Sequence, residues 1–306
     1  LIMSSDVEAD KAAVKLIREQ GDDQFMVVRA SEPVSGDELS ELGADVVINP
    51  SSVIADFALR SLESGELEYK ARQLSEVIED TRDRMAILTH DNPDPDSIAS
   101  ATALQAVADH LDVEADIFYM GDIGHQENRA FANLLGIELN DWDQVEDADQ
   151  YDTIALVDHA KSAEFQVDLD VDALIDHFEP DVDYDAEFVD VRPNMSSTST
   201  IMTKYIQEFD MNVGEEVATA LLYGIRAETL DFKRDTNPAD LTAAAYLYPF
   251  ANHDTLEQVE SPSMSPETLD VLAEAITSRE VQGSHLVSNA GFIRDRDALA
   301  QAAQHL

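Results

Sequence analysis

Apolar residues along the first 65 positions alternate between helical spacing and short continuous runs. The pattern predicts three helices, at 9–20, 35–43 and 51–64, and two buried strands, at 25–29 and 45–48. Helices that alternate with short buried strands are typical of a parallel sheet. We therefore expect an α/β segment over residues 1–65. The polar, charged stretch over 66–84 has a helical composition and predicts a connector between domains.

A second α/β series follows this connector. The predicted strands lie at 85–89, 115–120, 153–158 and 173–176, and the predicted helices at 98–110, 126–135, 198–209 and 214–224. With a polar turn over 228–240 and further helix to Tyr248, this series predicts one α/β domain over residues 85–260. A Ser/Pro-rich linker at 261–266, a helix, a β-like stretch at 284–288 and a helical start at Asp295 predict the beginning of a third, truncated α/β domain over 261–306.

Charge is the strongest feature of the composition. The chain has 19 Lys and Arg against 64 Asp and Glu, a formal net charge of −45, and 6 of its basic residues are Lys. Hydrophobic residues make up 44% of the chain, so the acidity does not indicate disorder. A folded chain that is rich in Asp and Glu and poor in Lys resembles the proteins of salt-accumulating halophiles. Repulsion between its carboxylates is screened in molar salt, where the Debye length is about 3 Å. We therefore expect a halophilic protein.

Composition also excludes several classes of site. The chain has no cysteine, which excludes disulfides, thiolate metal sites, iron–sulfur clusters and cysteine nucleophiles. The longest apolar candidate, around residues 241–251, is too short to cross a membrane, and the pattern of a secretory signal is missing. We expect a cytoplasmic protein without a membrane span. The chain begins at Leu1 and stops within a helical pattern at Leu306, so we also expect a longer natural protein.

One acidic segment stands out by its setting. The run HDNPDPDSIAS, at 90–100, follows a predicted strand and opens a predicted helix. Its His90, Asp94 and Asp96 are potential ligands at the carboxyl end of that strand, where open α/β sheets bind their ligands. Two prolines stiffen the loop and lower the entropy cost of ordering it. The alternative is a loop cluster of no function in a very acidic chain.

Further candidate ligands occupy equivalent positions in the pattern. Asp158 and the pair Asp176–His177 follow predicted strands, so their side chains could converge on the same edge. Glu228 lies just beyond the helix that ends near Gly224. Carboxylates with imidazole and no thiolate suit Mn²⁺ or Mg²⁺ and tolerate Co²⁺ or Zn²⁺, and two such ions that share a carboxylate serve phosphoester hydrolysis. Each residue also has an alternative without function: Asp158 could cap the end of its strand, His177 could be a buried core histidine, and Glu228 could cap a turn or form an ion pair.

Four motifs, in this order, resemble those of the DHH phosphoesterases, the family of RecJ-like exonucleases, nanoRNase/pAp-phosphatase enzymes and cyclic-dinucleotide phosphodiesterases. The motifs are HDNPDPDSIAS at 90–100, ALVDHA around Asp158, LIDHF at 174–178 and GIRAETLDF at 224–232. The resemblance covers about residues 85–248. It implies a DHH-type α/β domain with a parallel sheet and a metal-dependent hydrolase of ester bonds.

The resemblance also implies a site for two Mn²⁺ ions, with Mg²⁺ or Co²⁺ as alternatives. Six residues carry over by position: His90 and Asp94 for one ion, Asp96 and His177 for the other, Asp158 as the bridge and Glu228 as the last carboxylate. All of these except Glu228 are also the expected catalytic residues.

The chain departs from the family pattern at two positions. Phe178 replaces the final histidine of Asp-His-His, which in the family faces the substrate phosphate. Glu228 replaces an aspartate, and one added C–C bond changes its reach by about 1.5 Å. Asp231 is the alternative ligand. Arg226 and Ser199 are candidate substrate-binding residues, the latter within a Ser/Thr run that predicts a helix N-cap able to contact phosphate.

Two weaker resemblances flank this domain. Residues 31–62, with the strand before them, resemble the later half of a TrkA-type Rossmann domain, which binds nucleotides. The glycine-rich phosphate loop of such a domain is not in this chain, so nucleotide binding at residues 1–65 stays an open expectation. From Ser284 the chain resembles the beginning of a DHH-associated substrate domain, whose glycine-rich motif is also missing here.

Three functions are compatible with these observations. The leading one is a Mn²⁺-dependent phosphoesterase that hydrolyses short nucleotide phosphoesters: oligoribonucleotides of a few residues, pAp or a cyclic dinucleotide. A RecJ-like exonuclease on long single strands comes second, because 19 basic residues offer little material for a basic groove. The third is a regulatory module that senses a nucleotide without turnover. The sequence leaves a homodimer open.

Overall fold

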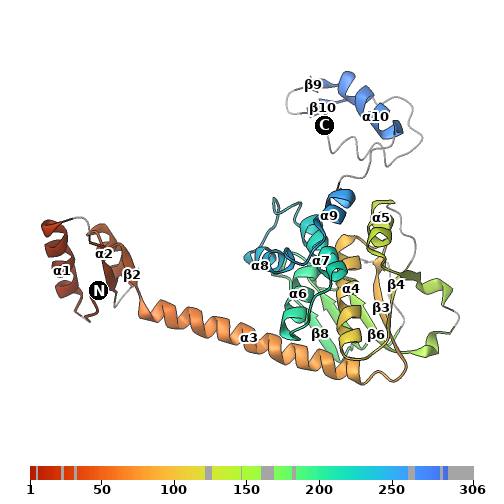
Figure 1. Cartoon of the computed structure of the whole chain (residues 1–306), viewed down its shortest axis with the longest axis horizontal. Helices are drawn as coiled ribbons and strands as arrows, with labels where there is room; N and C mark the ends of the chain where they lie inside the picture. The colour runs from red at the N-terminus through yellow and green to blue at the C-terminus, as the bar shows by residue number, and fades with distance from the viewer. Residues whose placement is uncertain are drawn as a thin grey trace. The chain divides into compact units, whose positions relative to one another are not determined.

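The computed structural model describes residues 1–4, 6–21, 24–30, 33–120, 126–145, 147–159, 169–180, 184–260, 266–282 and 285–288. It divides into two compact units, Leu1–Arg72 and Gln73–Leu306 (Figure 1). Residues 261–265 of the expected linker, Ser284 and the expected helical start at Asp295 lie outside the described residues.

The first unit is a small parallel sheet with two helices. Strands β1 (Val27–Arg29) and β2 (Val46–Ile48) pair in parallel, and Ile2 forms a parallel bridge to Val28. Helices α1 (Val7–Gln20) and α2 (Pro33–Glu41) pack on this sheet. The alternation of helices and short strands therefore predicts these elements correctly.

Helix α3 (Pro50–Glu79) is one uninterrupted helix of 30 residues. The sequence predicts a helix at 51–64 followed by a separate connector over 66–84, and the structure joins the two. Asn49 caps the start of α3, because its Oδ1 accepts the backbone N–H of Ser51 at 2.9 Å. Gly65 lies inside α3 without ending it, since a lone glycine in a helix costs only about 1 kcal/mol.

The second unit is built on a parallel sheet of six strands in the order β5-β4-β3-β6-β7-β8. The strands are β3 (Arg84–Asp91), β4 (Ala115–Met120), β5 (Leu139–Asp141), β6 (Tyr151–Val157), β7 (Ala173–Asp176) and β8 (Phe188–Val191). Every pair is parallel, so the predicted α/β fold with a parallel sheet is confirmed. The pattern misses β5 and β8, because edge strands of three and four residues carry too little periodicity.

In the part of the chain that the structure describes, six helices accompany this sheet and contact it or one another. They are α4 (Pro95–His110), α5 (Gln126–Leu135), α6 (Thr198–Glu208), α7 (Glu215–Glu228), α8 (Pro238–Leu247) and α9 (His253–Glu260). Later in the chain come α10 (Pro266–Thr277) and a hairpin of β9 (Glu280–Gln282) and β10 (His285–Val287), and two 3₁₀ turns, at 142–144 and 148–150, precede β6. Helix α4 packs against both α6 and α7 (Figure 1). Among the described residues, we find no helix with the length and apolar character needed to span a membrane.

Candidate metal centre

The candidate ligands gather where three neighbouring strands end. His90 lies near the end of β3, Asp158 directly follows β6, and His177 directly follows β7. Strands β3, β6 and β7 are adjacent and parallel, so their carboxyl ends share one edge of the sheet. Asp158 turns there in the left-handed region, with a φ of 50°.

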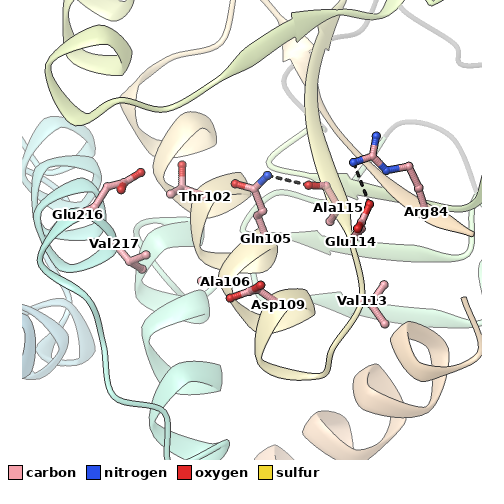
Figure 2. A pocket seen from close by; sticks show the side chains of 10 residues that line it. All are labelled: Arg84, Thr102, Gln105, Ala106, Asp109, Val113, Glu114, Ala115, Glu216 and Val217. Carbon is pink, nitrogen blue, oxygen red and sulfur yellow. Dashed lines mark hydrogen bonds and ion pairs between the residues drawn. The ribbon is translucent and has the colours of Figure 1, made fainter.

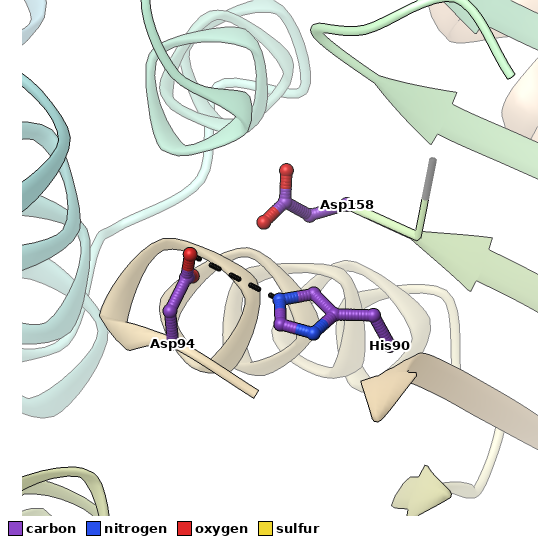
Figure 3. A group of neighbouring side chains, drawn as sticks. All are labelled: His90, Asp94 and Asp158. Atoms are coloured by element: carbon purple, nitrogen blue, oxygen red, sulfur yellow. Dashed lines mark ion pairs between the residues drawn. The ribbon is translucent and has the colours of Figure 1, made fainter. Parts of the chain in front are cut away.

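The first group of ligand atoms comes from His90, Asp94 and Asp158, which all lie within 4.8 Å of one another (Figure 3). Asp94 is the N-cap of α4, and its Oδ1 accepts the backbone N–H of Ser97 at 3.0 Å. His90 Nδ1 lies 2.6 Å from the carbonyl oxygen of Asp91, so Nδ1 carries the proton and donates it. His90 Nε2 therefore faces Asp94 Oδ2 at 3.9 Å, in the orientation that metal-ligating histidines adopt.

The second group comes from Asp96, Asp158 and His177, and all three residues are buried. His177 Nε2 lies 3.5 Å from Asp158 Oδ1 and 3.9 Å from Asp96 Oδ2, yet it makes no hydrogen bond to any described residue. A buried imidazole nitrogen without a hydrogen bond, aimed at two carboxylates, is the geometry of a ligand atom. Asp158 belongs to both groups, as a carboxylate shared by two ions would.

The start of helix α6 orients two of these carboxylates. The backbone N–H groups of Thr198 and Ser199 each donate to an oxygen of Asp96 at 2.8 Å. The Thr198 hydroxyl donates to Asp158 Oδ1 at 2.9 Å. A helix N-terminus favours negative charge through its exposed N–H groups, and here these groups bind Asp96. The sequence predicts a helix N-cap here, with a phosphate contact as the alternative. Thr198 itself was missed, because nothing in the Ser/Thr run distinguishes it.

The electrostatics of the cluster fit a bound cation. Burial and the nearby Asp158 carboxylate raise the pKa of Asp96 to about 7, and His177 offsets this only in part. Burial lowers the pKa of His90, but the Asp94 carboxylate outweighs burial, so the pKa rises to about 9. Divalent ions would neutralise the buried carboxylates and reverse both shifts. With only oxygen and imidazole donors, the residues present fit Mn²⁺ or Mg²⁺.

The fourth motif does not join either group. Glu228, the last residue of α7, is half-buried and belongs to neither group of ligand atoms. Asp231 pairs with Arg226, whose Nη2 lies 2.8 Å from its Oδ1, and this side-chain hydrogen bond lowers the pKa of Asp231. Asp231 and Arg226 thus form an ion pair with each other. The role of Asp231 as a metal ligand and that of Arg226 as a substrate contact stay predictions.

Two other candidates differ in their exposure. Ser199 is fully buried, and its hydroxyl faces that of Ser100 in α4 at 3.4 Å, so the side chain lies in a helix interface. A substrate contact by Ser199 stays a prediction that this geometry does not favour. Phe178 is 44% exposed, and its ring lies 4.1 Å, centroid to centroid, from that of His177. An apolar surface therefore borders the candidate metal centre.

A separate cavity of about 330 Å³ lies near the amino-terminal ends of β3 and β4 (Figure 2). Arg84, at the start of β3, lines it and pairs with Glu114 at 3.1 Å and with Asp116 at 2.9 Å. Asp109 and Glu216 add further acidic groups to the lining. None of the candidate metal ligands lines this cavity, so the two sites are distinct.

Comparisons with known proteins agree with this geometry. An uncharacterised protein of Methanocaldococcus jannaschii is 35% identical over 100% of this chain and 67% of its own length. Residues 84–225 match the DHH family, N-terminal domain. The chain belongs to the DHH family. The matched DHH domain contains both groups of ligand atoms, whereas Glu228 lies beyond its end.

Two further relatives share part of the chain. A probable manganese-dependent inorganic pyrophosphatase of Bacillus licheniformis is 27% identical over 68% of this chain and 70% of that protein. A crystal structure of an exopolyphosphatase-related protein from Bacteroides fragilis has a TM-score of 0.58 at 18% identity, covers 70% of this chain and 66% of that chain, and thus shares the fold. The chain spans about two thirds of the length of these relatives. Family and relatives identify the DHH domain as that of a metal-dependent phosphoesterase.

Proposed function

We propose that this protein is a manganese-dependent phosphoesterase that hydrolyses short nucleotide phosphoesters at the carboxyl edge of its six-stranded sheet. The observation that carries the proposal is the pair of ligand groups that share Asp158, with a buried His177 Nε2 that makes no hydrogen bond to a described residue. The Bacillus licheniformis relative, a probable manganese-dependent pyrophosphatase, supports manganese as the metal. We propose that the site holds two such ions, one at each group of ligand atoms.

Each group would offer three protein ligands and leave positions for water and substrate. Asp94 and His90 would hold one ion, Asp96 and His177 the other, with Asp158 between them. Such ions lower the pKa of a bound water and neutralise charge on the phosphoryl oxygens. The start of α6 holds Asp96 and Asp158 in place, and the Asp91 carbonyl keeps the His90 Nδ1 proton away from the site.

Phe178 supports a nucleotide as the substrate. Its half-exposed ring beside His177 offers a flat apolar surface within reach of a group bound at the metal centre. A nucleobase stacks on such a ring with about 1–3 kcal/mol, whereas inorganic phosphate gains nothing from it. Inorganic pyrophosphate is the second candidate substrate, and the similarity to the probable pyrophosphatase of Bacillus licheniformis favours it.

The test is Mn²⁺-dependent release of mononucleotide from a 5′-phosphorylated dinucleotide, with pAp, a cyclic dinucleotide, a long single strand and pyrophosphate assayed in parallel. The control is the double variant Asp96→Ala, His177→Ala. We expect turnover of at least one short nucleotide that the control abolishes. Faster turnover of pyrophosphate than of every nucleotide would favour the second candidate.

A Phe178→Leu variant, which keeps an apolar side chain without a ring, separates the two substrates further. We expect it to lower kcat/KM for the nucleotide about tenfold and to leave kcat/KM for pyrophosphate unchanged, because only a base stacks on a ring. The variant Phe178→His tests the third function. A folded, metal-loaded protein that is silent on all substrates, and that gains activity with this substitution, would indicate a nucleotide-sensing module.

A further inference from the structure

The first backbone N–H groups of helix α6 are bound in two ways. Those of Thr198 and Ser199 donate to the two oxygens of Asp96, each at 2.8 Å. That of Thr200 donates at 3.1 Å to the hydroxyl of Ser197, the N-cap of the helix. Because these groups have no partner within the helix itself, other atoms must bind them. The orientation of Asp96 therefore depends on how firmly the first turn of α6 is held.

A buried carboxylate of another helix holds this turn. Asp240, in the first turn of α8, is fully buried, and its Oδ1 accepts the hydroxyl of Thr200 at 2.6 Å. Its Oδ2 accepts the backbone N–H of Asn237, the N-cap of α8, at 2.8 Å. Each oxygen thus binds one of the two helix starts. A buried polar group whose bonds are all made is rigid, so Asp240 fixes the start of α6 against that of α8.

The carboxylate of Asp240 also sets the direction of the neighbouring hydrogen bonds. A carboxylate accepts and does not donate, so the hydroxyl of Thr200 gives its single proton to Asp240. Thr200 Oγ1 can then accept from the hydroxyl of Ser197, which lies 3.0 Å away. With its proton turned to Thr200 Oγ1, Ser197 Oγ presents a lone pair to the backbone N–H of Thr200, as an N-cap must.

Two further hydrogen bonds join the segments that precede the two helices. The hydroxyl of Ser196 donates to the carbonyl oxygen of Asp235 at 2.6 Å, and Asn237 Nδ2 donates to the carbonyl oxygen of Asn194. Asp235, Asn237 and Asp240 follow the fourth motif, at 224–232, none of whose residues belongs to either group of ligand atoms. The segment after this motif is therefore linked to the metal centre through α6.

We propose that Asp240 is a positioning residue of the metal centre. It holds the first turn of α6, this turn holds Asp96, and Asp96 then faces one ion together with His177. The proposal rests on the proposed function in one respect, namely that these ligand atoms bind Mn²⁺. His90 and Asp94 are oriented by backbone groups of their own loop, so the ion that they hold should depend less on Asp240.

Two variants and two controls test the proposal. Asp240→Asn keeps the size of the side chain, but an amide has one donor end, which must face a donor of either Thr200 or Asn237. Thr200→Val removes the hydroxyl and keeps the branched shape, whereas the control Thr200→Ser keeps the hydroxyl. The matched control is Tyr205→Phe, because Tyr205 donates from the second half of α6 to another buried carboxylate, Asp190.

The first measurement is hydrogen exchange of the Thr198 and Ser199 amides by NMR in metal-free protein. We expect exchange at least about tenfold faster in Asp240→Asn and in Thr200→Val, because both release the first turn of α6. Both controls should exchange at the wild-type rate. This comparison needs neither metal nor substrate. Exchange at the wild-type rate in both variants would overturn the proposal.

The second measurement is Mn²⁺ titration by calorimetry. We expect one ion to bind about tenfold more weakly in Asp240→Asn and the other to change less than about threefold, since the shared Asp158 also accepts from Thr198 of α6. Turnover should return as Mn²⁺ is raised, because Asp240 is not itself a ligand.

The outcomes separate this proposal from the proposed function. A wild-type protein that binds Mn²⁺ and hydrolyses no nucleotide would contradict the proposed function alone, and the role of Asp240 would still be decided by exchange and titration. Faster amide exchange with unchanged affinity for both ions would mean that Asp240 only stabilises the fold, which overturns the proposal. A wild-type protein that binds no Mn²⁺ would overturn both.

Discussion

Replacement of Gly224 by alanine tests how the helices position the metal centre. A Cβ at this position of α7 would lie 2.4 Å from Ser199 Oγ, 3.1 Å from Ala99 Cβ and 3.2 Å from the carbonyl oxygen of Pro95. These atoms belong to α6 and α4, so three helices meet at the missing side chain. Because Ser199 is fully buried, rotation of its hydroxyl away from the new Cβ gives up the contact with Ser100 Oγ and meets other closely packed atoms.

The expected loss of stability follows from these contacts. Overpacking of a buried interface costs about 1–3 kcal/mol, and the better helix propensity of alanine offsets up to about 1 kcal/mol of this. We expect a net loss of about 1–2 kcal/mol in the free energy of unfolding, which lowers the midpoint of thermal unfolding by about 3–6 °C for a unit of this size. Mn²⁺ affinity should fall as well, since the displaced N–H groups of Thr198 and Ser199 hold Asp96.

The assay is thermal unfolding of metal-free protein together with Mn²⁺ titration by calorimetry. Gly65→Ala is the matched control, because Gly65 also lies inside a helix and nothing lies within 4 Å of an added Cβ there. We expect the control to be at least as stable as wild type, with a gain of up to about 1 kcal/mol from the better helix propensity of alanine. The double variant Ser199→Ala, Gly224→Ala removes the 2.4 Å contact and should recover at least half of the lost stability. A Gly224→Ala protein as stable as the control would refute this reasoning.

Three further predictions concern the metal centre and the charge. Asp158→Asn should abolish tight binding of both ions, whereas Asp94→Asn should weaken only one, and the stoichiometry of Mn²⁺ by calorimetry checks this. Mn²⁺ affinity should weaken as pH falls from 9 to 6, because the metal must displace a proton from His90, with its pKa of about 9, and below pH 7 also from Asp96; an affinity that is constant over this range would contradict the pKa shifts. The midpoint of thermal unfolding should rise steeply between 0.1 and 2 M KCl, because screening relieves the repulsion of a chain with net charge −45, and a flat dependence would count against a halophilic protein.

The sequence by itself determines most of the secondary structure of the DHH domain. Buried strands such as β3 and β6 are continuous apolar runs because both of their faces are covered, one by α4 and the other by Trp142 and Tyr184 of the connecting segments. The loop from His90 to Ser97 is recognisable from its prolines and acidic residues directly after a strand. Parallel strands share one carboxyl edge, so the convergence of His90, Asp158 and His177 also follows from the pattern. The resemblance of four motifs adds the pairing of these residues, and the structure brings all but Glu228 into two groups.

Only the tertiary structure decides which groups surround these ligands. The N–H groups of α6 reach Asp96 across about 100 residues of sequence, and no local pattern records such a contact. The buried place of Ser199 and the pairing of Asp231 with Arg226 depend on how elements pack, because exposure belongs to the assembled fold. Hydrophobic period and motif act over a few residues, whereas burial and charge at a site sum over every element that meets there.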